Sequence, residues 1–266
     1  MNATRTRIGT VAGLRRYPVK SMQGERLPRV AVGPGGVDGD RRFAVIDAET
    51  GRVASAKNPR KWAALLDHRA EWRDGVLSVS PPDGPHFRSD RDDLGAALSG
   101  LLGRAVVVSG TPAAGAAIEV HWPAVAGLAG AGTEAVEELP AGRYVDLAPV
   151  HLITTATLAR LAALAPDSRF DERRFRPNVL IETGPGVTGF AENAWVGRTV
   201  VLGAARLRVA GPCSRCVMTT LPQAGLPADA GVLRAVVKHN AAAAGVYAAA
   251  EGVAEMAVGD AVWLEG

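Results

Sequence analysis

Both cysteines of this 266-residue chain lie in one short stretch, as Cys213 and Cys216. A thiolate is a soft ligand that suits a redox-active metal, and it is also the nucleophilic form of cysteine. Arg215 directly precedes Cys216, and a neighbouring positive charge favours the thiolate over the thiol. We therefore single out Cys216 as a candidate ligand of a cofactor metal.

Two other interpretations of the pair remain open. Most free cysteines are small buried apolar residues without a chemical role. The pair could also be half of a zinc site or a redox pair, although no two of the five histidines have the spacing that would complete a zinc site. A thioredoxin-like pair normally opens a helix, whereas residues 217–220 are β-prone.

A second candidate is the run Arg173-Arg174-Phe175-Arg176-Pro177-Asn178, which precedes an apolar segment. Its simplest interpretation is a solvated basic surface. If the run is extended, strand alternation places Arg174, Arg176 and Asn178 on one side. Guanidinium groups bind phosphate in a bidentate manner, and an asparagine amide offers a donor and an acceptor to a heterocycle. The run could therefore bind a cofactor that carries a phosphate.

Two weaker signals occur near the N-terminus. Lys20 and Ser21 follow a proline turn, and Asp40-Arg41-Arg42 precedes a predicted strand. Each is an ordinary solvated group when taken alone. Together they would add positive charge to a cleft between two domains, where ligands often bind. These parts fit an anionic organic cofactor that bears a metal.

The elements that must position these residues are mostly short strands. Strands are predicted at 8–14, 29–32, 42–47, 53–55, 76–79 and 104–109, separated by Gly and Pro turns, with one helix at 91–102. This pattern indicates a small barrel or rolled sheet. Residues 110–142 are rich in Ala, Gly and Pro and predict a loop that crosses between domains, with a possible short helix at 133–139.

The second half predicts a further mixture of strands and helices. A strand at 150–154 leads into a helix at 155–164, which Thr154 or Thr155 would cap; the alternative is that its first turn holds an anion. Further strands are predicted at 179–181, 199–202, 206–209, 245–248 and 258–264, and a helix at 233–240.

Composition excludes several classes of protein. The net charge of +3 without a long Lys/Arg block argues against nucleic-acid binding. No nucleotide phosphate loop motif occurs. The first residues lack a signal-peptide core and the longest apolar runs are too short to span a bilayer, so we expect a cytoplasmic protein without a membrane partner.

Five motifs together resemble the MOSC (molybdenum-cofactor sulfurase C-terminal) superfamily, and more narrowly the mitochondrial amidoxime-reducing component and its bacterial relatives. They are Tyr17-Pro18-Val19-Lys20-Ser21, Asp40-Arg41, Phe175-Arg176-Pro177-Asn178, Cys213 to Thr220, and Val258-Gly259-Asp260. The resemblance covers residues 8–264 and implies a mixed α+β, mainly β fold. A MOSC-type N-terminal β-barrel domain (1–115) would pack on a MOSC β-barrel domain with a few helices (116–266), with a crossing linker at about 110–142 and the cofactor in the cleft between the domains.

The resemblance also implies a molybdenum cofactor (Mo-molybdopterin), a pterin dithiolene with a phosphate. Cys216 matches the cysteine that binds the metal and would be the catalytic ligand, whereas Cys213 matches a common cysteine that is not a ligand. The matching cofactor-binding positions, together with the arginine beside the ligand, are Lys20, Ser21, Arg41, Thr154, Thr155, Arg176, Asn178 and Arg215.

The implied function is a molybdenum-dependent oxidoreductase that reduces small N-hydroxylated compounds (amidoximes, hydroxylamines, N-oxides) to amines. Several bacterial relatives carry a cysteine-rich iron–sulfur domain, which these 266 residues lack, so we expect a separate electron-transfer protein or reductase as partner. The alternative is a non-catalytic MOSC module that binds or delivers the cofactor, or carries sulfur as a persulfide on Cys216. A two-domain binding protein with structural cysteines is the third possibility.

Overall fold

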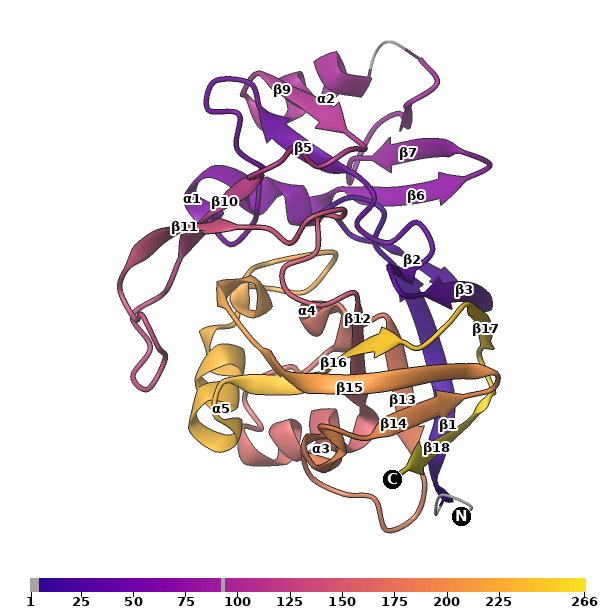
Figure 1. Cartoon of the computed structure of the whole chain (residues 1–266). Coiled ribbons are helices and arrows are strands. Elements are labelled where there is room, and N and C mark those ends of the chain that lie inside the picture. The colour runs from indigo at the N-terminus through magenta and orange to yellow at the C-terminus, as the bar shows by residue number, and fades with distance from the viewer. Residues whose placement is uncertain (1–4, 92–93) are drawn as a thin grey trace.

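The chain folds into two parts, of which the larger is a closed β-barrel (Figure 1). This computed structural model describes residues 5–91 and 94–266. Seven strands close the barrel in the order β1–β13–β12–β16–β15–β14–β18, because β1 pairs with both β13 and β18. Only the β12–β13 pair is parallel among these neighbours. The strands are β1 (Arg5–Arg16), β12 (Val150–Thr154), β13 (Val179–Thr183), β14 (Thr199–Leu202), β15 (Ala205–Ser214), β16 (Ala243–Ala250) and β18 (Ala261–Glu265).

Alternation of side chains fills the barrel interior. In β15, Ala205, Leu207 and Val209 are buried while Arg206 and Arg208 face solvent, the period of two expected of a strand. The pairing of β1 with β18 shifts in register between Arg7 and Gly9, which indicates a β-bulge there. A Cβ at Gly9 would lie 2.0 Å from the Glu182 carbonyl oxygen, so only glycine permits this approach.

Helices cover one side of the barrel. α3 (Thr155–Leu164), α4 (Glu172–Phe175) and α5 (Ala230–Asn240) enclose a separate apolar cluster that includes Leu161, Phe175 and Val236. The Thr154 hydroxyl caps α3 by accepting from the Thr157 N–H. Two 3₁₀ turns complete this part, η2 (Ala191–Trp195) and η3 (Val217–Thr220).

The smaller part lies over one end of the barrel (Figure 1). Its core is built around Trp62, Leu65, Leu77 and Leu98. Strand β2 (Glu25–Leu27) extends the barrel sheet, and β17 (Ala254–Ala257) pairs with β3 (Arg29–Gly33) beside β4 (Gly36–Val37). The remaining elements are β5 (Ala44–Asp47), α1 (Pro59–Trp62), η1 (Ala63–Asp67), β6 (Arg69–Arg73), β7 (Val76–Ser80), β8 (Phe87–Arg88), α2 (Leu94–Leu102), β9 (Val106–Ser109), β10 (Ala117–His121) and β11 (Glu134–Glu138).

The mainly β fold with a closed barrel and few helices is confirmed. The division at residue 115 stays a prediction, and β1 shares one sheet with strands that follow residue 149. The helix expected at 91–102 includes residues 92–93, which lie outside the described part, and α2 accounts for Leu94–Leu102. Within the described ranges, no helix has the length and apolar character needed to cross a membrane.

Three local predictions were wrong. Residues 110–142 are not simply a crossing linker, because they contain the β10–β11 hairpin, and the helix expected at 133–139 is strand β11. Pairing with β10 provides hydrogen bonds that override the helix preference of Ala and Glu. Residues 217–220 form η3 and not a strand, because the Thr219 and Thr220 hydroxyls donate to the carbonyls of Cys216 and Val217.

Candidate functional site

A cavity of about 260 Å³ is lined by residues of both parts of the molecule. Seven residues selected from the sequence line it, although they come from distant segments: Lys20, Ser21, Arg41, Arg176, Asn178, Arg215 and Cys216. The structure does not bring Thr154 and Thr155 to this cavity. Thr154 is fully buried and donates to Glu192, and the Thr155 hydroxyl accepts from the Thr183 N–H.

Three of the cavity residues adopt a left-handed backbone. Ser21 has φ 66°, Arg41 has φ 45° and Arg176 has φ 53°. This conformation costs about 1 kcal/mol or more for a residue with a Cβ, and it persists where the surroundings impose it. Only four other non-glycine residues in the described part of the chain have positive φ. Such concentration of strain is typical of a ligand-binding site.

Arg176 ends α4, and its side chain is buried without a compensating carboxylate. Its guanidinium donates to the Met22 carbonyl, and the Arg41 guanidinium donates to the Arg176 carbonyl at 3.3 Å. Burial, together with the nearby Arg41 charge, lowers the pKa of Arg176 to about 10. In the described part of the chain Arg176 forms no ion pair, whereas Arg41 pairs with Asp40. An anion in the cavity would neutralise Arg176.

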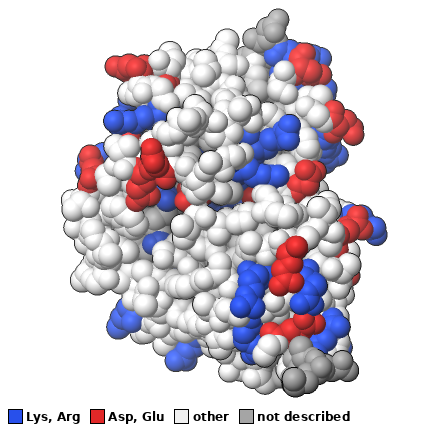
Figure 2. Space-filling model, viewed as in Figure 1, with Lys and Arg blue, Asp and Glu red and all other residues white. Residues whose placement is uncertain are grey.

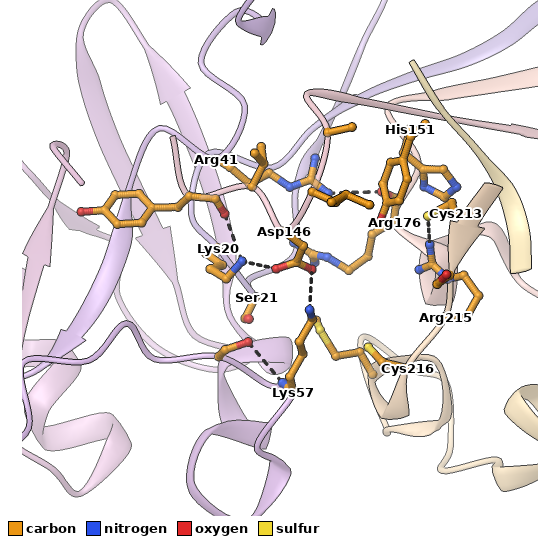
Figure 3. A pocket seen from close by; sticks show the side chains of 18 of the residues that line it. Lys20, Ser21, Arg41, Lys57, Asp146, His151, Arg176, Cys213, Arg215 and Cys216 are labelled. Atoms are coloured by element: carbon orange, nitrogen blue, oxygen red, sulfur yellow. Dashed lines mark hydrogen bonds and ion pairs between the residues drawn. The ribbon is translucent and has the colours of Figure 1, made fainter. Parts of the chain in front are cut away.

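A carboxylate joins two lysines on the other side of the cavity. Asp146 pairs with Lys20, and its second oxygen lies 3.5 Å from Lys57 Nζ (Figure 3). Burial tends to raise the pKa of Asp146, but Lys20 and Lys57 outweigh it and hold that pKa well below its usual value. Burial also lowers the pKa of Lys20 despite the contact with Asp146. Two ammonium groups thus share one carboxylate.

The two cysteines occupy different environments. Cys213 is buried, and its sulfur accepts a 2.7 Å hydrogen bond from Arg215, whose other nitrogen donates to the Phe175 carbonyl. Cys216 is partly exposed directly before η3, and it lines the same cavity as Lys57. Burial acts to lower the pKa of Lys57, but Asp146 and Cys216 outweigh it and raise that pKa above its usual value. Arg215, which was expected to stabilise a Cys216 thiolate, thus donates its hydrogen bond to Cys213.

The predicted alternation of Arg174, Arg176 and Asn178 was wrong. Arg174 is fully buried away from the cavity because residues 172–175 form α4, and Arg176 then reverses the chain. The Arg174 guanidinium donates to the carbonyls of Arg169, Thr219, Leu221 and Pro227. It thereby supports η3, which begins directly after Cys216.

Comparison with family models decides the family. The model of the MOSC N-terminal beta barrel domain matches residues 8–112, and that of the MOSC domain matches residues 141–263. The chain belongs to the MOSC-domain superfamily. MOSC domains in general bind the molybdenum cofactor, and the family is associated with molybdenum cofactor sulfurases and reductases.

Two solved structures are similar to this MOSC protein, and the first of them shows the same fold. The YuaD protein of Bacillus subtilis is 12% identical with a TM-score of 0.50, covering 99% of this chain and 98% of YuaD. YiiM of Geobacillus stearothermophilus is 15% identical with a TM-score of 0.33, covering 44% of this chain and 54% of YiiM. No curated protein matched the chain.

The cavity residues of this MOSC protein fit a molybdenum cofactor. Five cationic side chains and three carboxylates line the cavity, an excess of two positive charges that suits a phosphate. Arg215 Nε is buried without a hydrogen-bond partner, and the Cys216 sulfur offers a soft metal ligand. Within residues 5–91 and 94–266, no group of three or more His, Cys, Asp or Glu side chains could hold a metal ion.

Sequence reasoning missed several cavity residues. Lys57, Asp146, His151 and Tyr247 all line the cavity, yet none belongs to a motif that was noticed. Lys57 follows the predicted 53–55 strand, of which only Val53 forms isolated bridges, to Ile46 and to Ile118. The loop that carries Lys57 therefore had no clear sequence pattern. Asn178 was found, but its amide accepts from the His151 N–H and donates to the Arg15 carbonyl, which leaves one N–H and one lone pair for a ligand.

Replacing Asp146 by asparagine is expected to lower the free energy of unfolding by about 1–3 kcal/mol, because it leaves buried Lys20 without its carboxylate. Urea unfolding of the cofactor-free protein measures the change. Inorganic phosphate should restore part of the loss, since an anion replaces the missing charge. Equal stability of the variant and the parent would show that the ion pair contributes nothing.

His151 predicts a pH dependence of stability. Burial, together with the Arg215 charge, lowers the pKa of His151 to about 3, below the value of about 6.5 in an unfolded chain. Below pH 6.5 the unfolded chain binds a proton that the folded protein does not, so stability should fall from pH 6.5 towards pH 3. A His151→Gln variant should show a shallower decline between pH 6.5 and 4.5, whereas His86→Gln, at an exposed site, should follow the parent protein.

Proposed function

We propose that this protein is a molybdenum-cofactor-dependent reductase of N-hydroxylated compounds such as amidoximes, hydroxylamines and N-oxides. The observation that carries the proposal is a partly exposed cysteine sulfur in a cavity with an excess of positive charge. For a hydroxylamine, two electrons and two protons break the N–O bond, giving the amine and one water molecule. A separate electron-transfer protein would supply the electrons, and the reducing cytoplasm would suit the two free cysteines.

Different residues of the cavity would bind the phosphate and the metal of the cofactor. Arg176 and Arg41 would hold the phosphate end, with Lys20 and the hydroxyl proton of Ser21 as further donors. Cys216 would supply the protein ligand to the metal, while Arg215 and Asn178 line the same cavity and offer further donors. When bound, the molybdenum cofactor supplies the two-electron redox chemistry.

Apolar side chains would receive the organic part of the substrate. Trp122, Leu147 and Met218 line the same cavity as Cys216. Leu147 is 69% exposed, so it marks the side of the cavity that is open to solvent. A small apolar group could lie there while its N–O group faces the sulfur ligand. This placement favours compact aromatic or aliphatic N-hydroxylated substrates.

The alternative is a MOSC module that carries the cofactor, or carries sulfur as a Cys216 persulfide, without reducing a substrate. A partly exposed thiol in a cavity that Lys57 also lines is compatible with either role. One experiment separates them. Protein expressed with ample molybdate is analysed for molybdenum and assayed with benzamidoxime and reduced methyl viologen. Molybdenum with turnover supports the reductase, molybdenum without turnover supports the carrier, and protein without molybdenum contradicts both cofactor-binding roles.

A further inference from the structure

A second depression lies behind the wall of the cavity. This groove has a volume of about 700 Å³, is widely open, and is lined by both parts of the molecule. Four arginines line it: Arg15, Arg26, Arg69 and Arg173. Nothing in the proposed reduction uses these side chains.

A single layer of residues separates the groove from the cofactor cavity. Asn178 lines the cavity, and its amide donates at 3.3 Å to the carbonyl of Arg15, which lines the groove. Arg176 lines the cavity and donates to the carbonyl of Met22, whose neighbour Gln23 lines the groove. The groove is therefore a short through-protein route to the residues that would hold the cofactor.

Charge is unevenly distributed over the groove. Glu172 accepts from Arg15 and from Arg26, and its side chain is only 14% exposed. The side chains of Arg26 and Arg69 are 76% and 56% exposed. Asp67 is the one exposed carboxylate among the groove residues that the structure describes. Arg69 also pairs with Glu71, whose side chain is 31% exposed. Among the groove residues, the exposed guanidinium groups of Arg26 and Arg69 thus outnumber the exposed carboxylate of Asp67.

We propose that this groove docks an acidic electron-carrier protein. The proposal rests on the proposed reductase function, because it assigns the place where the two electrons enter. Two one-electron carriers would each be oxidised once per N–O bond that is reduced. Acidic side chains of the carrier would pair with Arg26 and Arg69, and Leu158 and Leu180, which also line the groove, would give apolar contact. Substrate would enter from the other face, at the cavity that holds Cys216.

Charge reversal tests the proposal. The variant Arg26→Glu/Arg69→Glu is compared with the control Arg60→Glu/Arg206→Glu, which makes the same change in net charge. Arg60 pairs with Glu134 away from the groove, and Arg206 pairs with Glu251 and Glu265. Figure 2 shows basic and acidic side chains interleaved at the lower right, over β14, β15 and β18. The neutral variant Arg26→Gln/Arg69→Gln is included in case the reversal disturbs folding.

Turnover of benzamidoxime is measured with two donors, an acidic [2Fe–2S] ferredoxin and reduced methyl viologen. Ferredoxin affinity for the protein as purified is measured by calorimetry. We expect the groove variants to lower ferredoxin-driven turnover and affinity about ten-fold at low salt, with viologen-driven turnover unchanged. The control should retain both activities, and the parent rate with ferredoxin should fall as salt increases.

The outcomes separate the two proposals. A parent protein that fails with viologen would refute the reductase function itself. A parent that works with viologen but not with ferredoxin would overturn the docking site, as would groove variants that behave like the control. If the neutral variant also lost viologen-driven turnover, the groove would serve the cavity structure and not docking.

Discussion

Replacing Cys216 by alanine is expected to remove molybdenum from the protein and to abolish N–O reduction. Cys216 is the partly exposed sulfur in the cavity, and within the described residues no cluster of His, Cys, Asp and Glu could hold a metal in its place. Loss of an outer partner of a metal site costs roughly 10- to 100-fold, and loss of the only protein ligand should cost more. Metal analysis and viologen-driven turnover measure the effect.

Cys213 provides the matched control three residues away. Its sulfur is buried and accepts from Arg215, so Cys213→Ser should keep an acceptor there and retain the metal. A Cys216→Ala protein with full metal content would contradict the assignment. A Cys213→Ser protein without metal, and with an unchanged melting temperature, would instead place the ligand at Cys213.

The second large effect is expected at Arg176. Its guanidinium lies near Arg41, forms no ion pair in the described part of the chain and donates to the Met22 carbonyl. Relief of the repulsion from Arg41 offsets part of the cost of that lost hydrogen bond, so Arg176→Ala should lower the free energy of unfolding of the cofactor-free protein by only about 1 kcal/mol. Affinity for the phosphate-bearing cofactor should fall by about 2–3 kcal/mol, or roughly 100-fold. Melting temperatures with and without cofactor, together with molybdenum content, measure both quantities.

Arg174 is the matched control for Arg176. It is equally cationic and fully buried, but it donates to four backbone carbonyls. Arg174→Ala should therefore lower the free energy of unfolding by several kcal/mol, because buried acceptors lose their donors. If Arg176→Ala unfolded the protein while the cofactor stayed bound in the folded fraction, Arg176 would be structural.

Part of the barrel could be predicted because several of its strands are short apolar runs that contrast with the turn residues around them. The strand at 150–154 and the helix at 155–164 were placed at their observed bounds. The β10–β11 hairpin was missed because its strands carry Ala and Glu, and only pairing across the hairpin makes them extended. Closure of the sheet by β1 could not be predicted either. It depends on pairing with β13, about 170 residues later in the sequence, as in the pair Gly9 and Thr183.

Some site residues could likewise be selected from the sequence, and others could not. Lys20, Arg41, Arg176 and Cys216 could be selected because they lie in short distinctive motifs. Lys57 and Asp146 could not, because each is an isolated charge in a loop, and only folding brings them together. The left-handed backbone of Ser21, Arg41 and Arg176 could not be predicted either, because this conformation is typical of glycine and none of the three is a glycine.

The position of β1 in the barrel affects how the chain must be made. Strand β1 is synthesised first, but it pairs with β13 and β18. Its partner β18 comprises residues 261–265 and is therefore synthesised last of the strands. Until then β1 has open edges, the kind of surface that pairs with other chains. Lys20 and Cys216, on opposite walls of the cavity, are held together only in the closed barrel. We therefore expect nascent chains that stop before residue 261 to aggregate readily, and cofactor loading to follow synthesis of the last strand.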